Sequence, residues 1–106
     1  MINVEIFCEA EGKITGFAVT GHAGLAASGQ DIVCAGVSAL TQAALLGLHE
    51  HLHRDVRYDK ASGKLIMHLV GAPDDCTEAV LQTMLLGLQG VAQYSPERVR
   101  IQVNRR

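Results

Sequence analysis

The chain has 106 residues with no tryptophan, two tyrosines and two phenylalanines, so its core must be built from aliphatic side chains. The formal net charge is −2 at pH 7, which argues against direct binding of nucleic acid through excess positive charge. Polar residues interrupt every apolar run, so we expect no membrane span. The N-terminus has no basic segment followed by an apolar stretch, so we expect no signal peptide and a cytoplasmic location.

Cysteine is scarce, with single residues at Cys8, Cys34 and Cys76. An odd number of cysteines without an export signal does not indicate a disulfide framework. No CxxC pair is present, which excludes a zinc ribbon or a thioredoxin-type motif, and we expect no metal or other cofactor. Most cysteines in cytosolic proteins are small buried hydrophobes, so the question is whether one of these thiols is reactive.

The hydrophobic pattern predicts one α+β domain over residues 1–106, with two layers and the element order ββαββαβ. Alternating apolar residues indicate strands, and a long stretch rich in alanine and leucine is typical of a buried helix. We expect a mostly antiparallel sheet of about five strands with two helices on one face. The expected elements are strands at 2–8 and 14–20, a glycine-rich loop at 21–30, a helix from about 31 to 53 whose last turn is solvated, strands at 56–58 and 64–70, a helix from about 75 to 93, and a strand at 98–103.

Cys34 is the thiol best placed for chemistry. If the long helix begins near Asp31, Cys34 lies in its first turn, where free N–H groups and the helix dipole stabilise an anion. A free thiol is mostly protonated at pH 7, and lowering its pKa by two units takes about 2.7 kcal/mol, more than the dipole alone supplies. His22, twelve residues earlier, is the available partner, and a nucleophile at a helix start with a base at a strand edge is an arrangement known from thiol proteases. Spacing alone leaves a buried Cys34 and an ordinary loop His22 as the alternative.

Asp31 has two possible roles that the sequence does not separate. Its carboxylate could orient the imidazole of His22, or it could cap the helix by accepting a backbone N–H. The glycines of the preceding loop, Gly21, Gly24 and Gly29, would allow close approach of the backbone to a substrate and a lid motion. We expect residues 23–30 to be disordered without ligand.

The other cysteines and the histidines favour structural roles. Cys76 also lies near a helix start, but neighbouring carboxylates oppose thiolate formation there. Cys8 follows the apolar face of the first strand and is expected in the core. His49, His51 and His53 fit a solvated helix end better than a metal site, and His68 is expected on a polar face of the fourth strand.

Two sequence blocks carry a family resemblance. Residues 21–24 (GHAG) and residues 29–40 (GQDIVCAGVSAL) resemble the signature of the ribosomal-processing cysteine protease Prp family, and the similarity spans essentially the whole chain. The catalytic histidine and cysteine of that family fall on His22 and Cys34, and its motif aspartate and serine fall on Asp31 and Ser38. Gly36 departs from the pattern, which usually has alanine there, and we expect only a slight softening of the helix.

The resemblance implies a specific activity and partners. Members of the family remove a short N-terminal extension from large-subunit ribosomal protein 27, which supports ribosome assembly, and they form homodimers. By this resemblance the substrate is the extension peptide of the ribosomal protein, cut by a thiol hydrolase that works without a cofactor. The alternatives are a non-catalytic, ribosome-associated dimeric module with a buried Cys34 and, more weakly, a thiol redox sensor.

Overall fold

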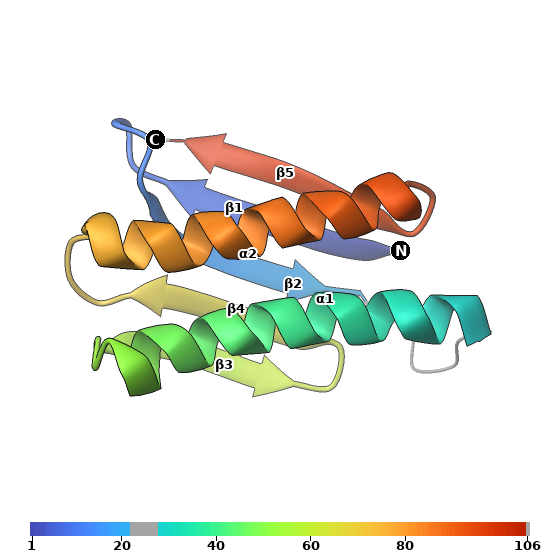
Figure 1. The fold of residues 1–106 in the computed structure, drawn as a ribbon, viewed down its shortest axis with the longest axis horizontal. Coiled ribbons are helices and arrows are strands. Elements are labelled where there is room, and N and C mark those ends of the chain that lie inside the picture. The colour runs from blue at the N-terminus through green and yellow to red at the C-terminus, as the bar shows by residue number, and fades with distance from the viewer. Residues whose placement is uncertain (22–27, 106) are drawn as a thin grey trace.

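The computed structural model describes the backbone of residues 1–21 and 28–105, with the side chains of residues 28–31 left out of the description. Five strands form one sheet in the order β3-β4-β2-β1-β5, and the two helices lie side by side on one face of it (Figure 1). The elements are β1 (Ile2–Cys8), β2 (Ile14–Thr20), α1 (Ser28–Leu46), the short π-helical turn η1 (Gly47–His51), β3 (Val56–Ala61), β4 (Lys64–Leu69), α2 (Asp75–Tyr94) and β5 (Val99–Arg105).

The sheet is mixed, with three antiparallel strand pairs and one parallel pair between β1 and β5. The two-layer α+β class, the order ββαββαβ and the placement of both helices on one face are confirmed. The parallel pair arises because α2 crosses over the sheet and returns the chain beside β1, a connection that needs a helix-length segment. A register shift after Phe7 leaves Thr15 unpaired, which keeps both Ile14 and Phe17 on the helix side.

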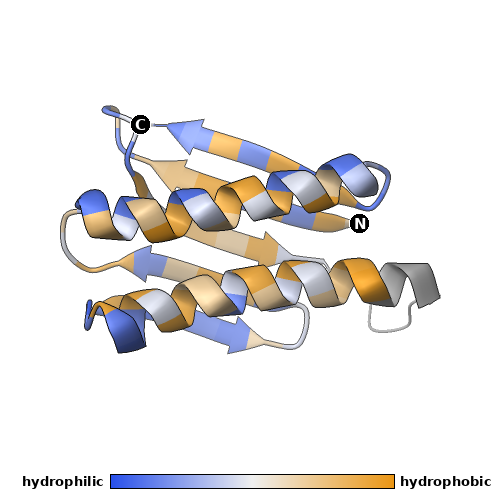
Figure 2. Ribbon diagram, in the orientation of Figure 1, coloured by the Kyte–Doolittle hydropathy of each residue, from blue (hydrophilic) through white to orange (hydrophobic). Residues whose placement is uncertain are grey.

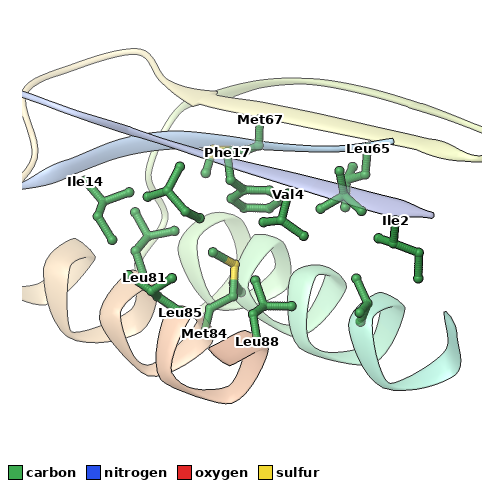
Figure 3. Close-up of a cluster of buried hydrophobic side chains, with 14 of the residues drawn as sticks. Ile2, Val4, Ile14, Phe17, Leu65, Met67, Leu81, Met84, Leu85 and Leu88 are labelled. Atoms are coloured by element: carbon green, nitrogen blue, oxygen red, sulfur yellow. The ribbon is translucent and has the colours of Figure 1, made fainter. Parts of the chain in front are cut away.

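The core lies between the sheet and the helices and is aliphatic apart from Phe17, as the composition predicts. Phe17 points from the centre of the sheet toward α2, where Met84 and Leu88 close the layer (Figure 3). Burial of one such side chain stabilises the folded state by about 1.5–3 kcal/mol. The contact of Phe17 with Met84 and Leu88 therefore holds α2 on the sheet. The apolar stripe of α2 that includes Leu81, Met84 and Leu88 is therefore a core face.

The first helix is more exposed than its composition suggests. The stretch Ile32–His51 has a mean hydropathy of 1.6, yet only 28% of it is buried, and by length and composition alone it is a helix that could cross a membrane. This differs from the expectation that polar interruptions exclude such a segment, because Ser38, Thr41 and Gln42 are too few to lower the mean. Core helices pass the same test, and Val33 and Val37 of α1 belong to the buried core. Figure 2 shows hydrophobic residues along most of the described length of α1 and hydrophilic ones at the end of the segment that follows it.

Candidate active site

A pocket with a volume of about 110 Å³ lies between the N-terminal half of α1 and the turn that joins β3 to β4. Its lining is more apolar than polar, and Cys34 is one of the lining residues. This is the combination expected of a small binding site, an apolar cavity with a few polar groups. The lining residues are Ile2, Val19, Cys34, Val37, Ser38, Thr41, Gln42, Lys60, Ala61, Ser62, Gly63, Lys64 and Leu65.

Cys34 is half-buried and packs against the core while it faces this pocket. The helix begins at Ser28, so Cys34 is its seventh residue and lies in the second turn. The expectation that Cys34 occupies the first turn is wrong. The effect of the helix dipole falls off within the first turn, so the dipole stabilises a thiolate here less than the sequence argument assumed.

Because α1 begins at Ser28, Asp31 and Gly29 occupy other positions in the helix than the sequence predicted. Asp31 is the fourth residue of α1, so it is not the residue that precedes and caps the helix, and Gly29 belongs to the first turn rather than to a loop. The spacing of Ser28 and Asp31 matches the Ser/Thr-x-x-Asp/Glu pattern typical of a helix start, a signal that would have located it. The side chain of Asp31 is outside the described part of the structure, so its orienting role stays a prediction.

Gly21 fixes where the chain leaves β2. Its φ is +84°, and a Cβ at this position would lie 2.7 Å from the carbonyl oxygen of Met1, so both backbone conformation and space require glycine. The N–H of Gly21 donates to the carbonyl oxygen of Gly63, at 3.1 Å, and Gly63 lines the pocket of Cys34. His22 and Gly24 themselves lie outside the described residues, as does most of the segment expected to be disordered.

Ser38 lies one helical turn after Cys34 and lines the same pocket. Its hydroxyl oxygen accepts a short hydrogen bond from the side-chain amide of Gln42, and the amide oxygen of Gln42 accepts from Nζ of Lys60 at 2.8 Å. Gln42 and Lys60 line the pocket as well, although neither was predicted as a site residue. Gln42 could have been found, because it shares the helical face of Cys34 and Ser38, whereas no local pattern brings Lys60 of β3 to this place.

The other two cysteines lie away from this pocket. Cys8 is buried in the core as expected, and burial raises the pKa of its thiol, although Arg105 opposes that shift. Cys76 is exposed in the first turn of α2. Burial therefore stabilises the neutral thiol of Cys8, whereas the side chain of Cys76 lies at the surface and does not line the pocket of Cys34.

The histidines expected to be structural are all described. His49, His51 and His53 lie at the exposed end of α1 and beyond it, and His49 forms an ion pair with Glu50 at 2.7 Å. Within the described residues no group of three or more metal-ligating side chains occurs. His68 is exposed on the sheet face opposite the helices, where its ring stacks on Phe7 with centroids 5.2 Å apart.

Comparison with known proteins places this geometry in a family. The sequence profile described as Cysteine protease Prp matches residues 1–100. Over 104 residues the chain is 36% identical to the ribosomal processing cysteine protease Prp of Staphylococcus aureus, in two strains, which covers 95% of this chain and 97% of the relative.

Solved structures agree with that assignment. The chain is similar to an essential ribosomal processing protease Prp from Staphylococcus aureus in complex with a substrate peptide, with a TM-score of 0.89 and 29% identity over 98% of this chain and all of that one. The same protease with a covalently linked product peptide matches with a TM-score of 0.81 and 32% identity over the same shares of the two chains. A Streptococcus mutans protein matches with a TM-score of 0.83 and 26% identity over all of this chain and 96% of that one. With its half-buried thiol facing a pocket at the rim of the sheet, this chain belongs to the Prp family of cysteine proteases.

Proposed function

We propose that this cysteine protease removes the N-terminal extension of large-subunit ribosomal protein 27 in the cytoplasm, with Cys34 as the nucleophile. The observation that carries the proposal is that Cys34 lines a pocket together with Gly63, whose carbonyl oxygen accepts a hydrogen bond from the N–H of Gly21, the residue before His22 in the sequence. The relatives are named ribosomal processing proteases, and one was solved with a substrate peptide. The ribosomal extension as substrate follows from the family resemblance of the two sequence blocks.

The proposed reaction passes through an acyl-enzyme. His22 accepts the thiol proton of Cys34, and the sulfur attacks the scissile carbonyl carbon to give a tetrahedral intermediate. The carbon–nitrogen bond then breaks, and the leaving amine takes the proton from His22. Water, deprotonated by His22, hydrolyses the thioester and regenerates the thiol.

Two supporting roles complete the proposal. Backbone N–H groups near Cys34 or in the segment after Gly21 stabilise the oxyanion, a contribution that is commonly among the largest in acyl transfer. Asp31 orients the imidazole of His22 and stabilises its charged form. The glycines Gly21, Gly24 and Gly29 allow the substrate backbone to approach the site.

The test is cleavage of the extended ribosomal protein from the same organism. Wild-type protein and Cys34→Ala are each incubated with it, and the new N-terminus is determined by mass spectrometry. The proposal predicts one internal cut by wild type and none by Cys34→Ala. If wild type leaves the extension intact but cuts other peptides, the substrate assignment is wrong. If wild type cuts nothing, the non-catalytic interaction module is the better hypothesis.

We also propose that the protein is a homodimer formed through the outer face of α1. No charged residue occurs between Asp31 and Glu50, and the exposed stripe of this helix includes Ile32, 67% exposed, and Leu46, 58% exposed. An apolar groove of about 450 Å³ runs beside this stripe between α1 and α2. A contiguous exposed apolar surface on a small protein is typical of an interaction site.

The dimer is tested by the molar mass in solution. Light scattering coupled to size-exclusion chromatography should give twice the chain mass for wild type and one chain mass for Leu46→Glu. Tyr94→Glu is the control for an added charge on an exposed side chain, because Tyr94 is 77% exposed and belongs to α2 rather than to the stripe of α1. A wild type that elutes as a monomer at high micromolar concentration would contradict the homodimer.

A further inference from the structure

A chain of side-chain hydrogen bonds joins the sheet to α1 across the wall of the Cys34 pocket. Nζ of Lys60 donates to Oε1 of Gln42 at 2.8 Å, and Nε2 of Gln42 donates to Oγ of Ser38. All three residues line the pocket. The chain therefore connects a charged group on β3 with a hydroxyl one helical turn from the thiol.

The direction of these hydrogen bonds is fixed by chemistry. An ammonium group has donors only, so the atom of Gln42 that faces Lys60 must be its carbonyl oxygen. The other end of the amide is then the NH₂ group, which can only donate, so the hydroxyl of Ser38 must accept. Lys60 thereby sets the orientation of the Gln42 amide, which otherwise could flip.

A serine hydroxyl has one proton, and a hydroxyl that accepts from Gln42 directs that proton elsewhere. Side chains on a helix tilt toward its N-terminus, and residues four apart share a face, so Ser38 projects from the helix toward the level of Cys34. Among the described residues, Ser38 and Cys34 form no hydrogen bond with each other. Among the side chains and backbone groups that the structure describes, the Ser38 hydroxyl donates to no acceptor, so these residues leave its proton to a group that enters the pocket.

We propose that Lys60 and Gln42 are positioning residues that hold Ser38 as a hydrogen-bond donor to a backbone carbonyl oxygen of the bound substrate peptide. The inference rests on the proposed peptidase function and assigns a substrate contact within that site. Ser38 makes the contact, whereas Gln42 and Lys60 act through it. Because the contact is to a bound peptide rather than to the reacting atoms, its loss raises KM and leaves kcat unchanged.

The decisive variant is Gln42→Glu. The new side chain has nearly the same shape and still pairs with Lys60, but it replaces the donating NH₂ by an accepting oxygen. Ser38 then donates its proton to the introduced carboxylate and no longer to the peptide. The expected effect equals that of Ser38→Ala, a rise in KM of roughly threefold to tenfold, the value of one neutral hydrogen bond.

Two further variants separate this role from a structural one. Lys60→Arg keeps a donor-only group opposite Gln42 and should retain the wild-type KM, whereas Lys60→Met allows the amide to flip and should raise KM. Gln89→Glu, on the exposed side of α2, controls for the change of net charge. Thermal unfolding of each variant shows whether it is folded.

The experiment measures kcat and KM for a peptide that spans the extension junction, and peptide affinity by fluorescence anisotropy in a Cys34→Ala background. We expect the double variant Ser38→Ala, Gln42→Glu to lose no more affinity than either single variant, because both remove the same hydrogen bond. If wild type cleaves the peptide and a folded Gln42→Glu binds it as tightly as wild type, the positioning role is wrong and the protease assignment stands. If the two single losses of peptide affinity multiply in the double variant, the positioning role is also wrong. A wild type that neither binds nor cleaves the peptide would overturn both proposals.

Discussion

Cys34 and Cys76 occupy similar places in the two helices but have different surroundings. The helices run in opposite directions across the same sheet face, so the two cysteines lie near opposite ends of the molecule (Figure 1). Cys34 is half-buried on the wall of a pocket, whereas Cys76 is exposed with Asp75 beside it. By helix position alone Cys76 is closer to a helix start than Cys34 is, because Cys76 lies in the first turn of α2 and Cys34 in the second turn of α1.

The surroundings of Cys34 and Cys76 differ because different segments of the chain pack beside the N-termini of α1 and α2. At the start of α2, Asp74 and Thr77 form a reciprocal capping box that satisfies the free N–H groups internally. Near Cys34, residues of the β3–β4 turn and of α1 instead line a cavity, and Gly63 of that turn accepts a hydrogen bond from the N–H of Gly21. A reactive thiol thus needs a second element that builds a site beside it, which a helix terminus alone does not provide.

The largest expected difference between the two ends is in peptide cleavage. Cys34→Ala should lower kcat/KM by roughly a thousandfold or more, because the nucleophile is lost. Cys76→Ala should change it by less than about twofold, since an exposed residue outside the pocket contributes little to stability or to binding. Both variants are measured with the same extension peptide. If the two substitutions lower kcat/KM equally, Cys34 and Cys76 do not differ in the way described here.

Two glycines with positive φ extend the comparison to the backbone. Gly12 has a φ of +102° in the β1–β2 turn, at the far end of the sheet, and Gly21 has a φ of +84° beside the pocket. Alanine at either position should lower the free energy of unfolding by about 1–2 kcal/mol, because the left-handed region is unfavourable for a residue with a Cβ. Only Gly21→Ala should also lower kcat/KM in the folded protein, since it redirects the chain at His22. Urea denaturation and peptide cleavage measure the two effects, and a folded Gly21→Ala with full activity would contradict this account.

The contact between the helices can be tested at two glycines of α2. A Cβ at Gly87 would lie 2.8 Å from Cδ2 of Leu40 on α1, whereas at Gly90 no atom lies within 4 Å. Gly90→Ala should raise the free energy of unfolding by about 0.5–1 kcal/mol through helix propensity. Gly87→Ala should lower it by about 1 kcal/mol, because Leu40 must move out of its place. If both substitutions stabilise equally in urea denaturation, the close approach of α1 to α2 is wrong.

The smallest effect concerns the cap of α2. The N–H of Thr77 donates to the carboxylate of Asp74, and this hydrogen bond lowers the pKa of that carboxyl below its ordinary value of 3.8, with a further contribution from Arg54. A lowered folded-state pKa means that the stabilisation is fully present above the ordinary value and is lost as the pH falls through the lower one. Asp74→Asn should therefore flatten the dependence of the melting temperature on pH in the acid range. An unchanged acid slope in this variant would contradict the assignment.

The fold was largely predictable from the sequence because its signals are local. Alternation of apolar residues defined β1 and β2, and the sequence also predicted a helix from about residue 75 to 93, close to the observed α2. The start of α1 was misplaced because Gly29 was taken as a loop residue, although Ser28 and Asp31 have the spacing of a capping pattern. The parallel neighbour of β1 could not be predicted, since local patterns do not determine which strand edge β5 joins.

The site was predictable only in part for the same reason. Cys34 and Ser38 share a helix face, so their common pocket follows from periodicity within one element. Lys60 reaches the pocket from β3 and Gly63 from the turn after it, so their contribution depends on tertiary packing. No spacing in the sequence links them to Cys34.

The most direct test of the central claim is to identify the residue that carries the acyl group during turnover. Wild-type protein is mixed with the extension peptide, quenched rapidly in acid and digested, and the fragments are analysed by mass spectrometry. The account predicts a thioester of the N-terminal product on the fragment with Cys34, and unmodified Cys8 and Cys76. Acylation of another residue, or cleavage by Cys34→Ala at the wild-type rate, would contradict it.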